Sequence, residues 1–348
     1  MRSELLDGLL AGIDEGLYEP FRNKTVVVTG ATGLIGSLVC KALLLANERM
    51  GLGCEVIAVV RDKAKLASVL KGYSELGKLS IVECDLAEGG LVIAAADFIL
   101  HAAAVTKSKV MVERPADVAL TSLRGTETML ETARATGARM VYISSMEMYG
   151  TLPEGSIANE SALGWIDLSV PRSCYPESKR MCECLCMSYA SQYCVQVCSA
   201  RLAQTFGAGV LPGENRAFAQ FAHAAMCNED IVLRTRGLSE GNYVNTVDCV
   251  AGLMALLVHG EAGLSYNVAN EESHGTIREV AELAIRVLGR GVSKVIVDVD
   301  ETNQAGYAPD VHLRLSSARL RGLGWKPLTS LAGSFAELGI YLREQGIE

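Results

Sequence analysis

Lys24 to Gly36, KTVVVTGATGLIG, is the stretch that decides the fold of this chain. Its first half, Thr25 to Thr29, is a short run of β-branched residues, which predicts a parallel strand buried on both faces. Leu34 to Asn47 then has the pattern of a helix. Three glycines lie between them or open the helix, at three-residue spacing: Gly30, Gly33 and Gly36.

This strand, glycine turn and helix N-terminus predict a dinucleotide-binding site. Glycines let backbone N–H groups approach a pyrophosphate, and the helix dipole favours its negative charge. The GxxGxxG spacing differs from the GxGxxG of the usual fingerprint, so a plain tight turn is the alternative.

The composition is that of a globular chain without a strongly charged partner. Its 348 residues suffice for a large α/β domain and a smaller one, and 49% are apolar against 21% charged. A net charge of −8 with no basic run argues against nucleic acid and anionic membranes as partners. No apolar stretch reaches the ~18 residues of a membrane span, and residues 1–22 carry acids where a signal peptide has a basic start. We therefore predict a cytoplasmic protein.

Eleven cysteines raise the question of a metal site or disulfides. The chain has no CxxC pair, and within its densest group only Cys182 and Cys186 would share a helix face. We expect reduced cysteines that pack as small apolar side chains, and no metal. His101 lies on an apolar strand with no partner at metal-ligand spacing, and we expect it to be structural.

Strands and helices alternate along most of the chain, and the predicted fold class is α/β. Residues 1–22 have apolar positions at helical spacing, which predicts an amphipathic helix against the main domain. Residues 23–202 predict a Rossmann-type domain with a doubly wound parallel sheet. Residues 203–348 predict mainly a smaller α/β substrate-binding lobe over the carboxyl ends of the strands, with segments at about 241–262 returning to the sheet.

Charged residues at two strand ends are placed to select and hold the dinucleotide. Arg61 ends the second strand, where an arginine suits the 2′-phosphate of NADP, while an acid such as the adjacent Asp62 suits the 2′-hydroxyl of NAD. We therefore expect NADP, with NAD as the alternative and a solvated charge pair as the plain interpretation. Asp85 ends the third strand and is placed to accept a hydrogen bond from the adenine amino group. We expect further cofactor contacts from the same strand ends and the glycine turn: Thr32, Leu34, Ile35, Leu86, Ala102, Ala103 and Leu202.

Ser145, Tyr175 and Lys179 form the pattern of a hydride-transfer site. Tyr175 and Lys179 are four residues apart and share one helix face, which brings the ammonium beside the phenol. A free tyrosine has a pKa near ~10 and is a poor base at neutral pH, but a neighbouring cation and an oxidised nicotinamide favour the phenolate. Ser145 ends the preceding strand, where it can hydrogen-bond the substrate hydroxyl that Tyr175 deprotonates. A YxxxK alone occurs by chance on many helices, and its place after the glycine turn and Ser145 makes it specific.

The sequence resembles the extended short-chain dehydrogenase/reductase family, in the NAD-dependent epimerase/dehydratase branch that acts on nucleotide sugars. The matching stretches span nearly the whole chain: TGATGLIG (29–36), HAAA (101–104), SSMEMYG (144–150), YPESK (175–179), RLAQTFG (201–207), YVNTVD (243–248) and LGWKP (323–327). The resemblance implies that the three glycines hold the pyrophosphate and that Asp85 lies at the adenine. It also implies that Lys179 contacts the nicotinamide ribose, and that Ser145 and Tyr175 flank the sugar C4 hydroxyl.

The resemblance implies two further features. Glu147 would assist chemistry near C5, as in the dehydratases and decarboxylases of the family. A homodimer would form by pairing the long helices at 117–136 and 176–192.

Several positions depart from the family pattern. Asparagine is usual at Ser122 and Gln204, and arginine at Gly241, and the last two positions usually hold the nucleotide diphosphate. Met146 stands where deoxythymidine-type 4,6-dehydratases have an acid, which counts against that activity. The cations that can substitute at the diphosphate are Arg216, Arg234, Arg236 and Arg314. We expect the substrate to be bound by Thr106, Ser145, Gln204, Arg216 and Arg314.

The predicted function is an NAD(P)-dependent nucleotide-sugar epimerase, dehydratase or decarboxylase that oxidises the sugar transiently at C4. One alternative is an NADP-dependent reductase of a non-sugar carbonyl, which Arg61 and Gly241 favour. The other is a non-catalytic dinucleotide-binding protein, against which the intact Ser145, Tyr175 and Lys179 argue.

Overall fold

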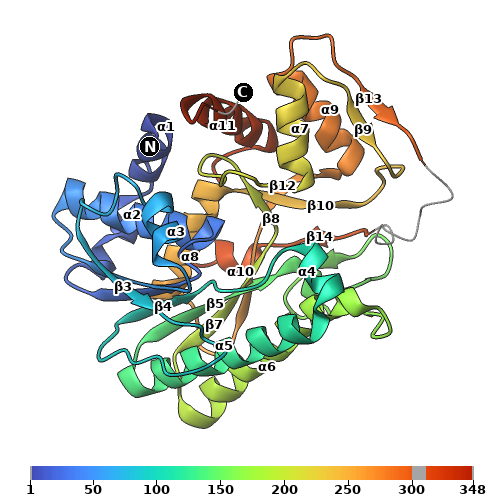
Figure 1. Cartoon of the computed structure of the whole chain (residues 1–348). Helices are drawn as coiled ribbons and strands as arrows, with labels where there is room; N and C mark the ends of the chain where they lie inside the picture. The colour runs from blue at the N-terminus through green and yellow to red at the C-terminus, as the bar shows by residue number, and fades with distance from the viewer. Residues whose placement is uncertain (1, 300–310, 347–348) are drawn as a thin grey trace.

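A seven-stranded parallel sheet forms the centre of the structure, a computed structural model that describes residues 2–299 and 311–346 (Figure 1). The strand order is β11–β7–β5–β4–β1–β2–β3, and every neighbouring pair is parallel. The strands are β1 Thr25–Thr29, β2 Glu55–Val60, β3 Lys78–Glu83, β4 Phe98–His101, β5 Arg139–Ser145, β7 Val197–Leu202 and β11 Ser265–Val268. The prediction of a Rossmann-type doubly wound sheet is confirmed, because strand order reverses between β1 and β4 and helices connect parallel strands.

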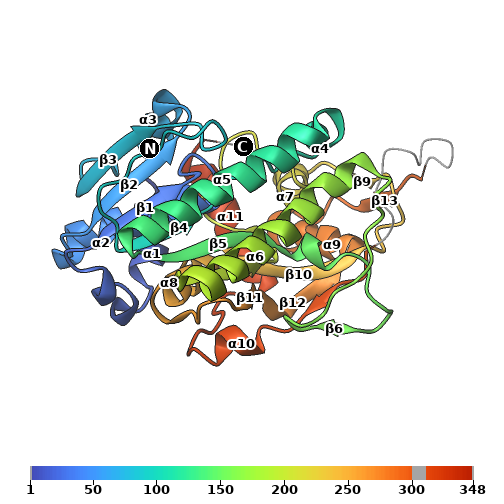
Figure 2. The same cartoon turned by 90° about the horizontal axis from the view of Figure 1, so that it is seen from below.

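Alternate residues of the central strands pack against helices on opposite faces of the sheet. Val27 and Met140 pack with α5 (Pro115–Thr136) and α6 (Cys174–Tyr193), which lie side by side in Figure 2. Val26 and Val141 pack on the other face with α2 (Leu34–Met50) and α8 (Thr246–His259). Both faces of the central strands are therefore covered, which explains why β1 and β4 are buried along almost their whole length, whereas the edge strand β3 is partly exposed.

A smaller lobe follows directly from the end of β7. Its three-stranded sheet has the order β12–β10–β8, from Asn270–Thr276, Glu240–Asn245 and Gln204–Phe206. A second pair joins β9 (Ile231–Leu233) and β13 (Val295–Val297), and α7 (Ala217–Met226), α9 (Ile277–Leu288) and α11 (Leu331–Glu344) pack around Phe206. Because β8 follows the last residue of β7 almost at once, the lobe lies at the carboxyl ends of the central strands. The division into a cofactor domain and a substrate lobe stays a prediction.

The chain returns to the main sheet through α8 and β11, over residues 246–268. β10, which lies at the beginning of the stretch predicted to return, pairs instead with β8 and β12 in the small sheet. A last short pair, β6 (Ile157–Ala158) with β14 (Arg314–Leu315), and α10 (Ala318–Arg321) tie the C-terminal part to the main domain.

The N-terminal helix is shorter than predicted. α1 covers Glu4–Ala11 only, and Gly12 ends it. Two short 3-10 turns follow, one capped by the Asp14 side chain and one with Pro20 in its first turn, because neither residue favours continuing an α-helix. Within the described ranges, no helix is both long and apolar enough to cross a membrane.

Candidate active site

The glycine turn between β1 and α2 is shaped for close approach of a ligand. Gly30 has a φ of 65°, and a Cβ on it would lie 2.7 Å from the backbone carbonyl of Ala102. A Cβ on Gly36 would lie 2.5 Å from the Gly30 oxygen, so neither position tolerates a side chain. Gly33 caps α2 without a side-chain acceptor, which leaves the first N–H groups of the helix for a ligand. The turn therefore fits a dinucleotide pyrophosphate.

Two side chains expected at the adenosine end of the cofactor lie face to face. The Arg61 guanidinium is 3.9 Å from the Asp85 carboxylate at the ends of β2 and β3. Asp62 faces a different partner, because its carboxylate accepts the Lys65 N–H at 2.8 Å and caps α3 (Lys63–Val69). Asp62 is therefore engaged by its own helix, while Arg61 remains 68% exposed and adjustable.

His101 is a core histidine with partners on both ring nitrogens. Thr29 Oγ1 lies 2.8 Å from Nδ1 and Thr126 Oγ1 lies 3.3 Å from Nε2. Burial first, and then the charge of Lys179, lowers its pKa to about 3, so the ring is neutral. Thr29 Oγ1 also accepts the Ala103 N–H at 3.1 Å, which holds the 102–103 backbone beside Gly30. The prediction of a structural histidine is confirmed.

Ser145, Tyr175 and Lys179 come together where β5 ends and α6 begins. The Lys179 ammonium donates to the Ile143 carbonyl at 2.7 Å and lies 5.8 Å from the centre of the Tyr175 ring. Tyr175 and Lys179 are both buried. The helix spacing that predicted their proximity therefore holds in the structure.

Burial disfavours the charged form of both Lys179 and Tyr175. It lowers the pKa of Lys179 to about 8. It also raises the pKa of Tyr175 to about 12, and the negative charge of Glu147 acts in the same direction. A hydrogen bond with Ser145 and the charges of Arg172 and Arg216 act in the opposite direction. Additional positive charge bound in this pocket would therefore make the phenol a usable base.

Glu147 forms an ion pair with Arg172, a contact that the sequence did not predict. The two nitrogens Nη1 and Nη2 of Arg172 donate to its two carboxylate oxygens at 2.7 and 3.2 Å. The Arg172 pKa is raised above its usual value mainly by this contact. Arg172 lies only three residues before Tyr175, in the short 3-10 turn Pro171–Ser173. That proximity to the YxxxK pattern is the signal that could have singled it out.

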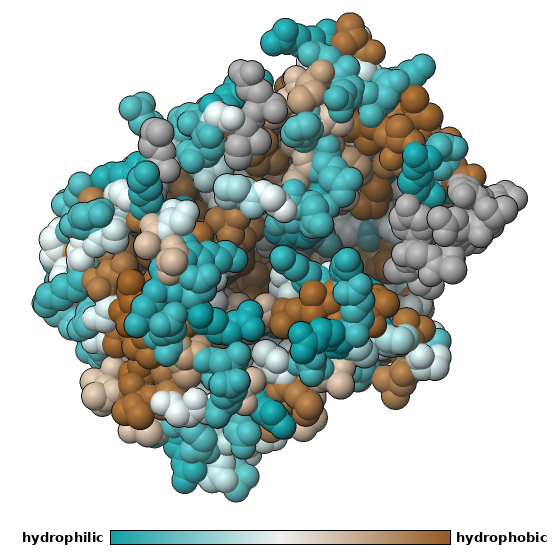
Figure 3. Space-filling model, in the orientation of Figure 1, coloured by the Kyte–Doolittle hydropathy of each residue, from teal (hydrophilic) through white to brown (hydrophobic). Residues whose placement is uncertain are grey.

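The expected substrate residues are spread over several elements. Arg216 caps α7, pairs with Glu214 at 2.7 Å, and lies close enough to Tyr175 to lower the pKa of the phenol. Gly241 on β10 faces Met146, whose Cε is 3.8 Å from the place of a Cβ, so a Cβ here would make ordinary van der Waals contact without a clash. Figure 3 shows the surface hollowed between the two lobes, with hydrophobic and hydrophilic residues around the hollow.

Among the described residues, no hydrogen bond or ion pair joins the other expected substrate residues to the Tyr175 phenol. Gln204 lies on β8 opposite Tyr243, and Thr106 is exposed in the segment before α4 (Ser108–Glu113). Arg314 is exposed on β14, and within 2–299 and 311–346 it has no charged partner. Arg234 pairs with Asp298 at the β9–β13 edge. These roles stay predictions.

A buried ion pair joins the elements that carry Ser145, Tyr175 and Lys179. Arg201 on β7 contacts the Glu183 carboxylate at 2.7 Å, and both side chains are 8% exposed. Glu183 lies one helical turn after Lys179, and it also bonds Ser144, the neighbour of Ser145, and the Ser265 hydroxyl at 2.9 Å. The pair therefore ties α6, β5, β7 and β11 into one unit.

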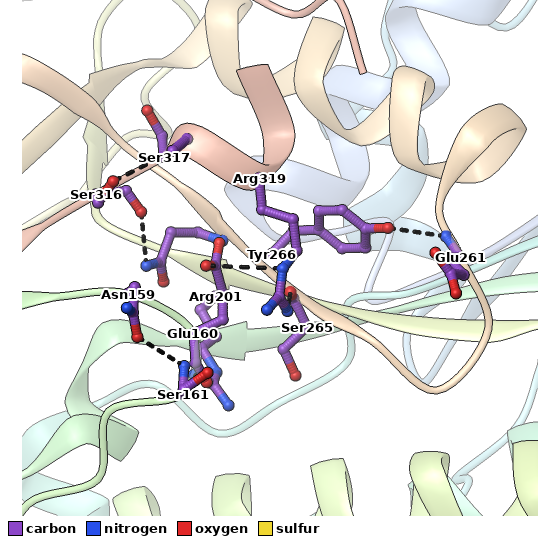
Figure 4. A network of polar contacts seen from close by, with 12 residues as sticks. Asn159, Glu160, Ser161, Arg201, Glu261, Ser265, Tyr266, Ser316, Ser317 and Arg319 are labelled. Atoms are coloured by element: carbon purple, nitrogen blue, oxygen red, sulfur yellow. Dashed lines mark hydrogen bonds and ion pairs between the residues drawn. The ribbon is translucent and has the colours of Figure 1, made fainter. Parts of the chain in front are cut away.

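The same network reaches the C-terminal segment. Arg201 donates to the Glu160 carbonyl at 2.9 Å, and the Glu160 carboxylate lies 3.9 Å from Arg319 on α10. Figure 4 shows Glu160 close to both arginines, with Tyr266 and Ser265 beside them. Arg319 also donates to the Ser265 carbonyl at 2.7 Å. α10 is thereby fastened to the edge strand β11.

Comparisons with known proteins agree with this geometry. The sequence profile of the "NAD dependent epimerase/dehydratase family" matches residues 26–269. UDP-glucuronic acid decarboxylase 1 of Xenopus tropicalis is 26% identical over 322 residues, which cover 92% of this chain and 73% of that protein. UDP-glucuronic acid decarboxylase 6 of Arabidopsis thaliana is 28% identical over 310 residues, covering 89% and 86%.

Solved structures share the fold. The epimerase Mth375 of Methanothermobacter thermautotrophicus superposes with a TM-score of 0.77 at 21% identity, over 95% of each chain. The dTDP-glucose 4,6-dehydratase of Bacillus anthracis, in complex with NAD, gives 0.76 at 18% identity, over 93% of this chain and 100% of that one. At these identities the likeness establishes the fold.

Proposed function

Because the chain belongs to the NAD-dependent epimerase/dehydratase family, we propose that it oxidises a nucleotide sugar at C4 and then releases the C6 carboxyl group as carbon dioxide. The observation that carries the proposal is the state of Glu147, paired through both oxygens beside Ser145 and Tyr175. The relatives named above, which are UDP-glucuronic acid decarboxylases, support the same substrate class.

The three reaction types of the family need different proton-transfer groups. Loss of water across C5 and C6 needs a base for the C5 proton and an acid for the leaving hydroxide. Here the carboxylate is tied to Arg172, and Met146 cannot donate a proton. Decarboxylation needs neither group, because a carboxylate one carbon removed from a ketone leaves as CO2 and its electron pair passes into the ketone. The residues at the end of β5 therefore favour decarboxylation over dehydration.

The chain's own residues would handle the protons and the orientation. Tyr175 takes the proton of the C4 hydroxyl, Ser145 hydrogen-bonds that oxygen, and Lys179 supports the phenolate with its charge. NAD or NADP, when bound at the glycine turn, supplies the oxidation of C4 and its later reversal. After CO2 leaves, C5 takes a proton from solvent and Tyr175 returns its proton to the C4 oxygen, so atoms and charges balance.

The product distinguishes the reaction types directly. We expect UDP-glucuronate to give a nucleotide pentose, lighter by one CO2, in mass spectrometry of the reaction mixture. A product with the same mass as the substrate would indicate an epimerase. A product lighter by one water would indicate a dehydratase. Either result would contradict the proposal.

We infer that NADP is the preferred cofactor. Arg61 ends β2 with an exposed guanidinium, and its contact with Asp85 at 3.9 Å is a surface ion pair that a phosphate can replace. The acid that would favour NAD, Asp62, is engaged as the cap of α3. Arg61→Asp should weaken NADP binding much more than NAD binding in titrations, and equal changes would show that Arg61 faces solvent.

We propose a homodimer that pairs α5 and α6 with those of a second copy. Both helices carry exposed apolar side chains, among them Leu120, Met181 and Met187. A cavity of about 350 Å³ lies along the same helix α6, with Met187, Leu163 and Leu264 in its lining. Apolar side chains on a long helix pair are typical of a surface that a partner covers.

We also propose a cytoplasmic location and no nucleic-acid or membrane partner. All eleven cysteines are unpaired thiols, as a reducing compartment would keep them, and the net charge of −8 repels anionic polymers and lipid surfaces.

A further inference from the structure

Arg172 and Glu147 form a bidentate ion pair that is partly exposed to solvent. The contact is bidentate, because each guanidinium nitrogen has its own carboxylate oxygen, at 2.7 and 3.2 Å. The two side chains remain 33% and 29% exposed, so the pair is reachable from outside. The turn that carries Arg172 is anchored by Ser173, whose hydroxyl donates to the Asp167 carbonyl at 2.6 Å. This hydrogen bond stabilises the turn that positions the Arg172 guanidinium.

The pair lies next to the atoms that act on C4. Glu147 follows Ser145 by two residues, and its N–H donates to the Ser145 hydroxyl at 3.2 Å. Arg172 and Glu147 are both close enough to Tyr175 to act on its charge, in opposite directions. Lys179 points elsewhere, to the Ile143 carbonyl. In a pyranose the C5 substituent adjoins C4, so a group that recognises C6 must lie beside the phenol and the serine.

Chemistry decides which C6 substituent can enter. A hydroxymethyl group cannot displace a carboxylate from arginine, because it offers no charge and no second oxygen. A sugar carboxylate has the same charge and the same two-oxygen geometry as Glu147. Exchange of one carboxylate for the other leaves the guanidinium paired throughout, so its desolvation is not an added cost.

We propose that Arg172 selects the substrate by its C6 carboxylate, which replaces Glu147 as the partner of the guanidinium. This inference rests on the proposed function. It makes Arg172 a specificity-determining residue, and it makes Glu147 a stand-in for the substrate in the free protein. A neutral sugar leaves the Arg172–Glu147 pair intact and gains nothing from it.

The test compares two ligands that differ only at C6, UDP-glucuronate and UDP-glucose. Affinities are measured by calorimetry on the dinucleotide-saturated Tyr175→Phe protein, which binds without turnover. Arg172→Met should weaken UDP-glucuronate about tenfold or more, the scale of charged hydrogen bonds, and UDP-glucose by less than about twofold. Arg172→Lys keeps the charge but cannot form two parallel hydrogen bonds, so its affinity for UDP-glucuronate should lie between those of Arg172→Met and the parent protein. Glu147→Gln removes the competing carboxylate, so it should leave UDP-glucuronate affinity unchanged or raise it.

Arg216→Met is the matched control, because this arginine is also near Tyr175 but pairs with Glu214. It should change both sugars alike. The assignment is overturned if Arg172→Met weakens both sugars equally or neither, or if Glu147→Gln weakens UDP-glucuronate. Should Arg172→Met fail to fold, Arg172→Lys and Glu147→Gln decide the matter. If the Tyr175→Phe protein binds neither sugar, the proposed function itself is contradicted and the inference falls with it.

Discussion

The ionisation of Tyr175 depends on several neighbouring groups. Burial and Glu147 oppose its ionisation, while Ser145, Arg172 and Arg216 favour it. Ionisation of the phenol therefore requires positive charge that offsets burial and Glu147, and Arg172 and Arg216 act in that direction. In the proposed reaction Tyr175 is the base, and these neighbours determine whether its phenol can ionise.

Tyr175→Phe should reduce turnover by at least about 10²-fold, the scale of a lost general base, because it removes only the phenol oxygen. Dinucleotide binding should persist, since the glycine turn is untouched. Steady-state rates and a binding titration check this together. Turnover close to that of the unmodified protein would exclude the phenol as the base.

His101 predicts a pH dependence of stability. Its pKa is lowered by burial to about 3 in the folded state, against ~6.5 for the unfolded chain, so the unfolded state binds the extra proton between these values. Stability that this histidine contributes is present above pH ~6.5 and is lost as the pH falls towards 3. From pH 6.5 to 5 the loss is about 2 kcal/mol.

His101→Gln should remove that part of the slope. Urea unfolding at both pH values, on both proteins, measures it, and the carboxylates common to the two proteins cancel in the comparison. An identical pH slope in the two proteins would show that His101 titrates normally.

At the scale of elements, the sequence predicted the main sheet and most helices of the small lobe, but not its strand β12. Thr25–Thr29 begins and ends as predicted, because an apolar β-branched run followed by glycine allows few alternatives. β12, with the sequence NEESHGT, has neither alternation nor a β-branched run, and it is a strand because β10 offers it partners.

In the candidate site too, the sequence predicted the local features and missed the contacts between distant residues. The spacing of Tyr175 and Lys179 is local and was visible in the sequence. The Glu147–Arg172 contact joins residues 25 positions apart across an irregular loop, so only the folded chain shows it. The pairing of Arg61 with Asp85 was hidden for the same reason.

Glu183→Gln should destabilise the junction of α6, β5 and β7. Removing one partner of a buried pair leaves Arg201 uncompensated, at a cost of about 3–5 kcal/mol in the free energy of unfolding. Glu131→Gln is the control, because its pair with Arg134 is about half exposed and is worth less than about 1 kcal/mol. Equal losses in the two variants, measured by urea unfolding, would refute a special role for the buried pair.

At the scale of the whole molecule, α1 contacts α11, whereas α6 leaves apolar side chains exposed to solvent. The Ser3 hydroxyl donates to the Glu344 carboxylate at 2.5 Å, which joins α1 to α11. The opposite situation holds on α6, where Met181 and Met187 are about half exposed. The contact between α1 and α11 is made within the chain, whereas the exposed apolar side chains of α6 form the surface that we propose a second copy covers.

The double variant Met181→Glu/Met187→Glu should convert a dimer into a monomer, because like charges would face each other across the pair of helices. Light scattering after size-exclusion chromatography gives the mass. Leu328→Glu, on a side chain 84% exposed outside these helices, is the control and should leave the mass unchanged. A dimer that persists in the double variant would move the interface elsewhere.

The most direct test of the account follows one hydrogen atom. UDP-glucuronate carrying deuterium at C4 is converted by the protein with its dinucleotide, and the product is examined by mass spectrometry and NMR. Transient oxidation at C4 followed by loss of CO2 predicts a nucleotide pentose that keeps its deuterium at C4. A decarboxylated product with ordinary hydrogen at C4, or a deuterated product of unchanged mass, would contradict the account.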